Sequence, residues 1–526
     1  MYARFGSGLR RFLRHPITVD EAVAEIRTRM AKREQNFLSL LRRGVFEYPR
    51  SPYLPLFRSA GCELGDVSGM VHRRGLEKTL LALRDAGVYV SFEECKGRVP
   101  IVRKGLEVPV AAHDFDNPWL EAHYVSESGG TTGAGTRVHH DLDYLAVRAT
   151  HDAVAYHAHG VLDAPVGVWR GVLPDGSGMN TTLSLCRCGN PPLRWFTPGT
   201  YRGLKPSLLK YQVANRLTVL AGRLSGSPVP RPEHVPVEQA GRIARWAAEM
   251  VRERGKCVLA MVASRALRVA VAARGEGIDL KGVTFVISGE PVTPGKVDGI
   301  RASGATYFTT YGFSEAGRIA RGCCSPVSSN DLHLLTDMCA VISYRRDLPG
   351  GVTVPAFNVT TLLPCLPKIL LNAESDDYGI LEERSCGCPL EELGYTTHVR
   401  EIRSFRKLTG EGVTMLGSDL LHILEDVLPQ RFGGSALDYQ LIEEEDEQGF
   451  THVTLAISPG IPIPDESAVI AVILAAMGKQ SVAGGGASER WSQSGNLRVK
   501  RIRPMLTARG KLLPLYLPKR HQRENS

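Results

Sequence analysis

The sequence predicts a large N-terminal α/β domain, with mixed or largely parallel sheets flanked by helices, and a small C-terminal α+β domain. From about residue 120 to 345, apolar strand-like runs alternate with amphipathic helical segments, which is typical of a parallel sheet with crossover helices. After about residue 404 the pattern changes to a helix, a hairpin and a second helix. The chain of 526 residues is long enough for both parts. We therefore place the domains at 1–403 and 404–526.

Local periodicity supports each element in turn. Helical spacing of apolar residues predicts helices over 20–45 and 76–86. The strand candidates of the α/β region are VGVWRGVL (166–173), CVLAMVA (257–263) and VTFVISG (283–289), with helices over 237–254 and 264–274. Residues 195–232, rich in Pro, Gly and basic side chains, look like an insertion or a mobile connection. The C-terminal elements are helices over 416–428 and 467–477 and a hairpin over 439–457.

Composition restricts the class of protein. A hydrophobic content of 43% and a charged content of 23% are those of a globular protein. No apolar run approaches the ~20 residues of a membrane span, and the arginine-rich N-terminus lacks the apolar segment of a secretory signal. We therefore expect a cytoplasmic protein without a membrane partner. Eleven cysteines are too sparse for a disulfide scaffold and are expected as free thiols or metal ligands.

The formal net charge of +9 has three interpretations. It could indicate nucleic-acid binding, but the basic residues are scattered and no aromatic-interleaved basic stripe appears. It could be a basic surface without a specific partner. A positive field also favours an enzyme whose ligands are polyanions, and this interpretation agrees best with the motifs below.

The stretch SESGGTTGAGTRV, residues 126–138, cannot pack a core. Its glycines let backbone N–H groups approach a phosphate closely, and its hydroxyl side chains add donors. The central residues are Ser128, Gly129, Gly130, Thr131, Thr132 and Gly133. The stretch is neither a Walker A loop, since no Lys-Ser/Thr follows, nor G-x-G-x-x-G. A phosphate-binding loop and a flexible surface loop both fit it.

Four further segments follow in order: VISGEP (286–291), TYGFSE (310–315), SDDYG (375–379) and TARGK (507–511). With the glycine-rich loop, they resemble the motifs of the adenylate-forming superfamily of acyl-CoA synthetases, adenylation domains and luciferases. The resemblance spans about residues 90–515 and implies the adenylate-forming ligase fold, in which a small C-terminal domain moves. Each motif alone is weak evidence for the family, but the five motifs in the family's order are strong evidence.

Cysteine positions refine the resemblance. RSCGCPL (384–390) and RGCCSPVSSNDLHLLTD (321–337) are similar to segments of phenylacetate–CoA ligase and the coenzyme F390 synthetases. The resemblance implies a structural Zn²⁺ site made of Cys323, His333, Cys386 and Cys388, with Cys324 as an alternative to Cys323. Three thiols and an imidazole are a reasonable tetrahedral zinc set, although Cys-x-Cys is tighter than the usual spacing. The alternative is four buried free residues.

The resemblance also implies roles for the motif residues. The residues from Ser128 to Gly133 would hold the β- and γ-phosphates of ATP. Glu315 would bind Mg²⁺, an ion that takes oxygen ligands and bridges phosphates. Asp377 would accept from the ribose hydroxyls, with Asp376 as the neighbour that could be confused with it. The remaining residues would line the adenine and acyl pockets: Ser288, Gly289, Glu290, Pro291, Tyr311, Gly312 and Ser314.

Two cations complete the expected catalytic set with Glu315. Arg403 is the candidate for contacting phosphate or ribose, with Arg400 as the alternative. Lys511 is the candidate catalytic lysine, because a flexible ammonium can neutralise charge as the new bond forms. Ile402 and Phe405 depart from the family's hinge pattern, in which a glycine and an aspartate are usual. This departure concerns the hinge rather than the nucleotide site.

The expected reaction joins a carboxylic acid, by family analogy aromatic or aryl-acetic, to AMP and then to CoA. The identity of the acyl acceptor stays open, because related ligases also use an amine, a protein cysteine or a carrier protein. A carrier protein would act here in trans. A homodimer is also compatible with the sequence. The alternative from another class is a non-catalytic nucleotide-binding homologue, which only the altered hinge supports.

Overall fold

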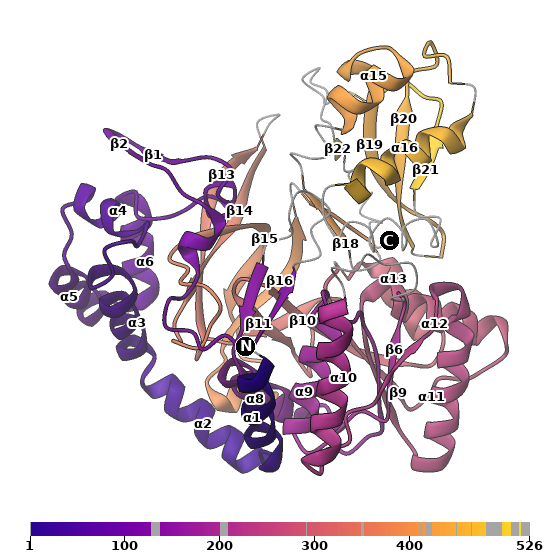
Figure 1. Ribbon diagram of the computed structural model, residues 1–526, viewed down its shortest axis with the longest axis horizontal. Coiled ribbons are helices and arrows are strands. Elements are labelled where there is room, and N and C mark those ends of the chain that lie inside the picture. Colours follow the sequence, from indigo (N-terminus) through magenta and orange to yellow (C-terminus); the bar gives the residue numbers. More distant parts are fainter. Residues whose placement is uncertain are drawn as a thin grey trace.

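A computed structural model describes residues 2–127, 137–199, 209–290, 292–348, 352–404, 407–410, 413–416, 423–448, 450–463, 465–479, 497–505 and 515–516. The chain begins with helices α1 (Tyr2–Arg14), α2 (Val19–Ala31), α3 (Arg33–Leu41), α4 (Leu54–Ser59), α5 (Leu64–Arg74), α6 (Leu76–Asp85) and α7 (Phe92–Cys95). Two short hairpins follow, β1 (Ile101–Arg103) with β2 (Leu106–Val108) and β3 (Tyr124–Glu127) with β4 (Arg137–His140). Figure 1 shows these elements around one large domain, with a smaller C-terminal domain above it.

A 12-stranded sheet forms the centre of the large domain. In spatial order its strands are β13 (Cys339–Leu348), β14 (Val352–Thr361), β15 (Ala373–Glu383), β16 (Thr397–Ser404), β12 (Asp331–Leu334), β11 (Gly317–Gly322), β10 (Thr306–Phe313), β9 (Val283–Ser288), β8 (Cys257–Met261), β5 (Val166–Trp169), β6 (Arg194–Thr197) and β7 (Pro232–His234). The strands from β7 to β10 are parallel, whereas those from β10 to β13 pair antiparallel. The predicted α/β alternation therefore ends at β10.

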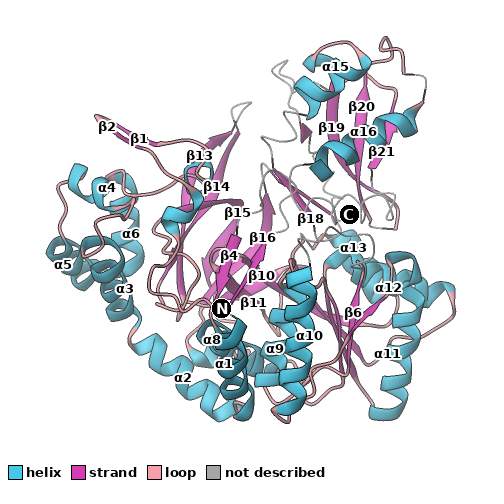
Figure 2. Cartoon of the chain, viewed as in Figure 1, coloured by secondary structure: helices cyan, strands magenta, loops and turns pink. Residues whose placement is uncertain are grey.

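The parallel half has a topological switch point between β5 and β8. The chain adds β6 and β7 on one side of β5, then returns to place β8, β9 and β10 on the other side. Its helices are α8 (Leu142–Ala158), α9 (Ser177–Arg187), α10 (Leu209–Leu224), α11 (Ala240–Arg254), α12 (Ala263–Gly275) and α13 (Pro294–Arg301). One apolar core joins α11 and α12 to the sheet, and a second lies against α8, α9 and α10. Figure 2 shows this helix–sheet–helix layering. Ligands of open α/β sheets bind beyond the carboxyl ends of the strands at a switch point.

The small domain has its own sheet and core. Its described elements are the hairpin β17 (Lys407–Gly410) with β18 (Val413–Leu416), the π-helix Ile423–Val427, α15 (Leu428–Phe432), β19 (Tyr439–Glu445), β20 (Thr451–Ile457), α16 (Glu466–Lys479), β21 (Leu497–Lys500) and β22 (Leu515–Tyr516). Strands β19 to β22 form a four-stranded sheet in the order β21-β20-β19-β22. The guanidinium of Arg268 on α12 lies 5.1 Å from the ring centre of Phe450, which joins the two domains.

The predicted fold class is confirmed, with local differences. The strand expected over 166–173 ends at Trp169, because the chain leaves the sheet at Arg170 and turns towards α9. The described part of 195–232 contributes β6, α10 and β7 to the parallel half, so the prediction of an insertion there was wrong. The helix expected from residue 416 has its first described turn at Ile423. The hairpin over 439–457 is confirmed.

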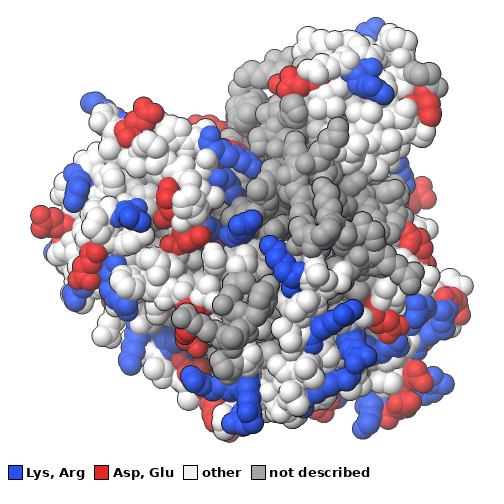
Figure 3. Space-filling model, viewed as in Figure 1, with Lys and Arg blue, Asp and Glu red and all other residues white. Residues whose placement is uncertain are grey.

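The surface and the helices bear on possible partners. On the face shown in Figure 3, Lys and Arg lie among Asp and Glu over the large domain. The positive charge of that face is therefore not gathered into one stripe. Within the described part of the chain, no helix combines the length and apolar character needed to cross a bilayer.

Candidate functional site

Tyr311 and Asp377, which belong to separate sequence motifs, meet at one end of the central sheet. The Tyr311 hydroxyl donates to Asp377 Oδ2 at 2.8 Å, and the Ser404 hydroxyl donates to Oδ1 at 2.5 Å. Burial and the adjacent Asp377 carboxylate raise the pKa of Tyr311 well above its ordinary value, so the phenol stays protonated. Asp376 lies on the same strand, is fully buried and has a left-handed backbone (φ 63°). Asp377, not Asp376, therefore shares this site with Tyr311.

Glu315 lies in the tight turn between β10 and β11, four residues after Tyr311. The side chain is buried and forms an ion pair with Lys96, which follows α7. Burial alone would raise the pKa of Glu315, but Lys96 and Lys368 outweigh it and lower the pKa. The carboxylate is thus kept ionised, as an oxygen ligand for Mg²⁺ must be. No sequence signal points to Lys96, because its partner Glu315 is 219 positions away.

Ser288 ends β9, and Glu290 lies two residues further on, but the two side chains make different contacts. Ser288 lies opposite Thr310 in the β9–β10 pairing and accepts a hydrogen bond from Arg170. The Glu290 carboxylate instead accepts from the backbone N–H and the hydroxyl of Ser264, both at 2.8 Å, at the start of α12. Gly289 between them has φ +82°, which favours glycine.

Gly312 is required by close packing. A Cβ added there would collide with the backbone of the opposite strand at Gly317 and Arg318. Ser314 lies in the turn next to Glu315 and is half-buried. The motif TYGFSE thus forms a tight β10–β11 hairpin that holds Tyr311 and Glu315 at one sheet end.

Several predicted residues lie outside the described part of the chain: Ser128, Gly129, Gly130, Thr131, Thr132, Gly133, Pro291, Phe405 and Lys511. Strands β3 and β4 flank the glycine-rich loop and pair with each other, for example Ser126 with Val138. Directly after β4, Asp141 accepts from the Asp143 N–H at 2.9 Å and caps α8.

The two candidate arginines differ in their contacts. Arg400 donates to Glu382 at 2.9 and 3.3 Å and to Glu401 at 2.9 Å. Arg403 is exposed, lies opposite Tyr378 in the β15–β16 pairing, and makes no ion pair within the described residues. It is also one residue from Ser404, which bonds Asp377. This geometry favours Arg403 over Arg400 as the residue available to a nucleotide.

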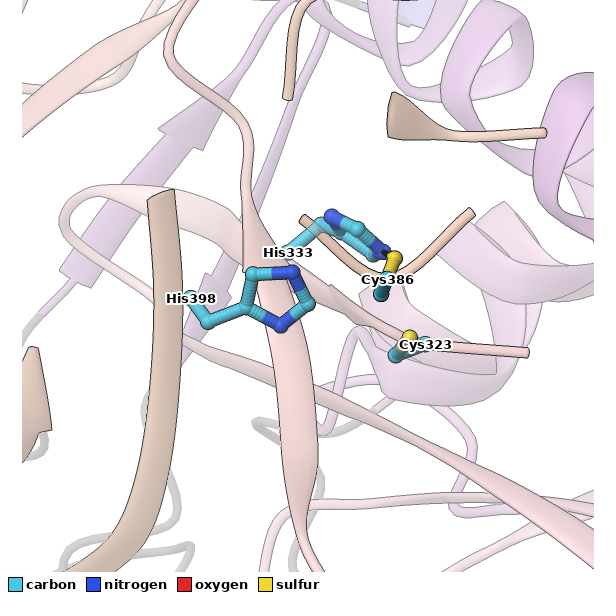
Figure 4. Close-up of side chains that lie close together, drawn as sticks. All are labelled: Cys323, His333, Cys386 and His398. Atoms are coloured by element: carbon cyan, nitrogen blue, oxygen red, sulfur yellow. Dashed lines mark hydrogen bonds between the residues drawn. The ribbon is translucent and has the colours of Figure 1, made fainter. Parts of the chain in front are cut away.

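A cluster of cysteines and histidines lies at the opposite end of the same strands. One ligand atom each from Cys323, His333, Cys386 and His398 lies within 4.8 Å of all the others, and the side chains converge in Figure 4. Cys388 belongs to the cluster too, because its sulfur lies 3.0 Å from His333 Nε2. Hydrogen bonds from Cys323 and Cys324 lower the pKa of Cys388. The four predicted ligands are therefore neighbours, together with Cys324 and an unpredicted histidine.

The imidazoles of His333 and His398 are each oriented by a contact of the Nδ1 atom. His333 Nδ1 lies 2.6 Å from the Tyr395 carbonyl, which can only accept, so Nε2 is left to face the sulfurs. His398 Nδ1 lies 2.8 Å from the Asp331 carboxylate, and its buried Nε2 has no hydrogen-bond partner among the residues that the structure describes. Metal-bound histidines are held in this way by a carboxylate or a carbonyl. Tetrahedral sites with three cysteines and one histidine, or two of each, are both usual for zinc. The residues thus fit the metal, with Cys388 and His398 competing for one position.

The comparisons with known proteins concern the fold. The sequence matches no protein-family model and no curated protein. Among solved structures, the chain is similar to a 2-hydroxyisobutyryl-CoA ligase in complex with 2-HIB-AMP and CoA in the thioesterification state. The identity is 17%, the TM-score is 0.53, and the match covers 96% of this chain and 91% of that one. The chain therefore has the fold of that ligase over nearly its whole length.

Two further matches are weaker. A malonyl-CoA ligase in a complex with methylmalonyl-CoA and AMP has 14% identity and a TM-score of 0.40, over 84% of this chain and 95% of that one. An o-succinylbenzoate CoA synthetase from Bacillus subtilis, a double mutant, has 12% identity and a TM-score of 0.42, over 83% and 80%.

Proposed function

We propose that the protein activates a carboxylic acid with ATP to an acyl adenylate, releasing pyrophosphate, and then transfers the acyl group to CoA as a thioester. The observation that carries the proposal is the hydrogen bond between Tyr311 and Asp377 at one sheet end, with Glu315 in the turn that follows the strand of Tyr311. The fold is shared with a ligase that was crystallised with 2-HIB-AMP and CoA, which supports the same chemistry here.

The residues divide the work of bringing two anions together. Asp377, held by Tyr311 and Ser404, is oriented to accept from the ribose hydroxyls. Glu315 would hold Mg²⁺, which would neutralise the charge of the phosphates when bound. The amides and hydroxyls of Ser128–Gly133 would cradle the leaving phosphates. Arg403 and Lys511 would neutralise the charge that develops as the carboxylate attacks the α-phosphate.

The identity of the acyl acceptor in the second step is the more specific part of the proposal. CoA is favoured because the matched ligase was crystallised with it. An amine or a carrier protein in trans would accept the same acyl adenylate. Rotation of the small domain, with the β17–β18 hairpin region moving towards the site, would exchange the lysine for a thiol channel.

We also propose that the Cys–His cluster binds a structural Zn²⁺. The supporting observation is the mostly buried set of thiols and imidazoles, whose histidine nitrogens are oriented by Tyr395 and Asp331. Its position at the far end of β11 and β16 from Asp377 suits a structural role rather than a part in the reaction.

ATP–pyrophosphate exchange with a panel of acids tests the first step, and thioester formation with and without CoA tests the second. We expect Lys511→Ala to lower the exchange rate by about 10²–10³-fold, the usual effect of losing one group that stabilises developing charge. Lys500→Ala is the matched control, because Lys500 pairs with Glu444 on the surface. Unchanged exchange in Lys511→Ala would contradict the catalytic assignment. ATP binding without exchange for any acid would indicate a non-catalytic homologue.

A further inference from the structure

Arg170 lies at the switch point of the parallel sheet. It is the first residue after β5, and its Nη2 donates to the Met261 carbonyl at 3.1 Å and to the Ser288 hydroxyl at 2.6 Å. Met261 and Ser288 are the last residues of β8 and β9. The guanidinium therefore crosses the carboxyl ends of three neighbouring strands, where open α/β sheets bind their ligands.

This position is adjacent to the proposed nucleotide site. Ser288, which Arg170 contacts, lies opposite Thr310, and the next residue on β10 is Tyr311. Tyr311 in turn bonds Asp377. A substrate whose carboxylate meets the nucleotide near Tyr311 would therefore extend its other end towards the strand ends that Arg170 covers.

The neighbourhood of Arg170 has an excess of buried positive charge. Arg148 on α8 and Arg318 and Arg321 on β11 all pair with Asp152, with Arg318 Nη1 2.6 Å and Arg148 Nε 3.6 Å from its carboxylate. Within the described residues, no carboxylate lies within ion-pair distance of Arg170, although the half-buried Asp175 attracts it. Three guanidinium groups thus share one buried carboxylate, and the neighbouring Arg170 has no ion pair among the described residues.

Such an excess is costly without a further anion. Burial, and repulsion between these arginines, lower the pKa of Arg148 and of Arg170 to about 9. The Nε atoms of Arg170 and Arg321 are buried and have no hydrogen-bond partner in the described structure. Buried charges are normally paired, so an anion brought by a ligand would relieve an imbalance that the protein leaves in place.

We propose that the acid activated by this protein carries a second anionic group at its far end, and that Arg170 binds that group. This inference rests on the proposed function and narrows its substrate to dianionic acids, foremost dicarboxylic acids. It replaces the aromatic or aryl-acetic acid expected from the resemblance, because an apolar ring would cover the Arg170 guanidinium without supplying an acceptor. The planar guanidinium suits a carboxylate better than an ammonium would.

The test compares acids of equal length with and without the second anion. ATP–pyrophosphate exchange is measured with succinate against butyrate, glutarate against pentanoate, and 4-carboxyphenylacetate against phenylacetate. A sulfonate, 3-sulfopropionate against propionate, shows whether the second anion must be a carboxylate. We expect kcat/KM to favour the dianionic member of at least one pair. In Arg170→Met, we expect that preference to fall by roughly 10²-fold, the scale for losing one partner of a buried charge pair.

Three variants make the result specific. Arg170→Lys keeps the positive charge but loses the planar guanidinium with its paired donors. It should retain part of the preference for the dianionic acid. Ser288→Ala removes the hydroxyl that accepts from Nη2 of Arg170. It replaces Arg170→Met in the test if circular dichroism shows that Arg170→Met does not fold. Arg216→Met, at an exposed position on α10, is the control and should keep the wild-type preference.

The outcomes separate this inference from the proposed function. Exchange with the singly charged acids only, or an unchanged preference in Arg170→Met and Ser288→Ala, would overturn the role of Arg170 and leave the ligase proposal standing. Exchange with no acid at all would overturn both. A dianion preference that depends on Arg170 would support both.

Discussion

Two ends of the same strands hold two different chemistries. At one end, Glu315 precedes β11, Asp377 lies on β15, and Ser404 ends β16. At the other end, Cys323 follows β11, Cys386 follows β15, and His398 lies near the start of β16. At about 3.3 Å per residue, the strand β11 alone separates the two ends by roughly 20 Å. The antiparallel half of the sheet thus carries a candidate nucleotide site and a candidate metal centre at opposite edges.

The two ends differ in what completes them. At the candidate nucleotide end, the side chains of Tyr311, Ser404 and Asp377 bond one another, and a substrate would add further partners. At the cysteine end, mostly buried thiols and imidazoles come from separate chain segments, and we propose that a metal ion completes them. Substitutions at the first end should therefore change activity with little effect on stability, and substitutions at the second end should do the reverse.

The largest expected effect is that of Asp377→Ala. It removes the acceptor for two ribose hydroxyls, and each charge-assisted hydrogen bond contributes about 1.5–3 kcal/mol. We expect kcat/KM for ATP in the exchange assay to fall by about 10³-fold, while the urea midpoint changes little. Asp298→Asn, at an exposed position on α13, is the control. A loss of stability that matched the loss of activity would erase the contrast between the two ends.

At the cysteine end, Cys323→Ser is expected to lose the metal and to destabilise the large domain. Without its metal, the cluster leaves buried polar groups with imperfect partners, which we expect to cost about 3 kcal/mol. Zinc per chain, measured by mass spectrometry, and urea unfolding followed by tryptophan fluorescence give the result. Cys62→Ser, at a half-buried free thiol, is the control. Equal zinc content in both variants would refute the metal centre, and lost exchange activity in still-folded Cys323→Ser would refute its purely structural role.

A finer comparison asks which residue is the fourth ligand. Cys388→Ser and His398→Gln each remove one competitor for the same position. The sequence predicts that Cys388→Ser releases zinc and that His398→Gln retains it, with a difference in stability of about 1–2 kcal/mol between them. The opposite ranking would assign a site with two cysteines and two histidines, held by the Asp331–His398 contact.

Sequence motifs identified residues at strand ends and turns, because their spacing is local. TYGFSE fixes Tyr311 and Glu315 through one hairpin, and SDDYG places Asp377 on the strand where its carboxylate reaches Tyr311. The two domains follow from the change of periodicity near residue 404. These features need only neighbouring residues and the general rules of sheet packing.

Lys96, His398 and Arg170 could not be predicted in the same way. Lys96 meets Glu315 across 219 positions, and His398 reaches the cysteines through the pairing of β16 with β12. Arg170 looked like part of a strand until the structure showed that β5 ends at Trp169. Each of these roles depends on tertiary contacts, for which one sequence contains no spacing signal. The roles assigned to Thr131 and Lys511 stay predictions.

The smallest expected effect concerns the pH dependence at the nucleotide end. Lys96 helps to hold the pKa of Glu315 below its ordinary value of 4.5, so the stability contributed by this pair is complete above that pH and is lost as the pH falls through the lowered pKa. In Lys96→Met, burial is opposed only by the weaker effects of Lys368 and a backbone hydrogen bond, and it should raise the pKa of Glu315. We expect the acid limb of kcat/KM for ATP and Mg²⁺ to move up by about one pH unit. Lys104→Met, at an exposed position, should leave the limb in place. An acid limb that did not move in Lys96→Met would mean that the ionisation of Glu315 does not control nucleotide use. The cysteine end would then be the end whose proposed role has the firmer support.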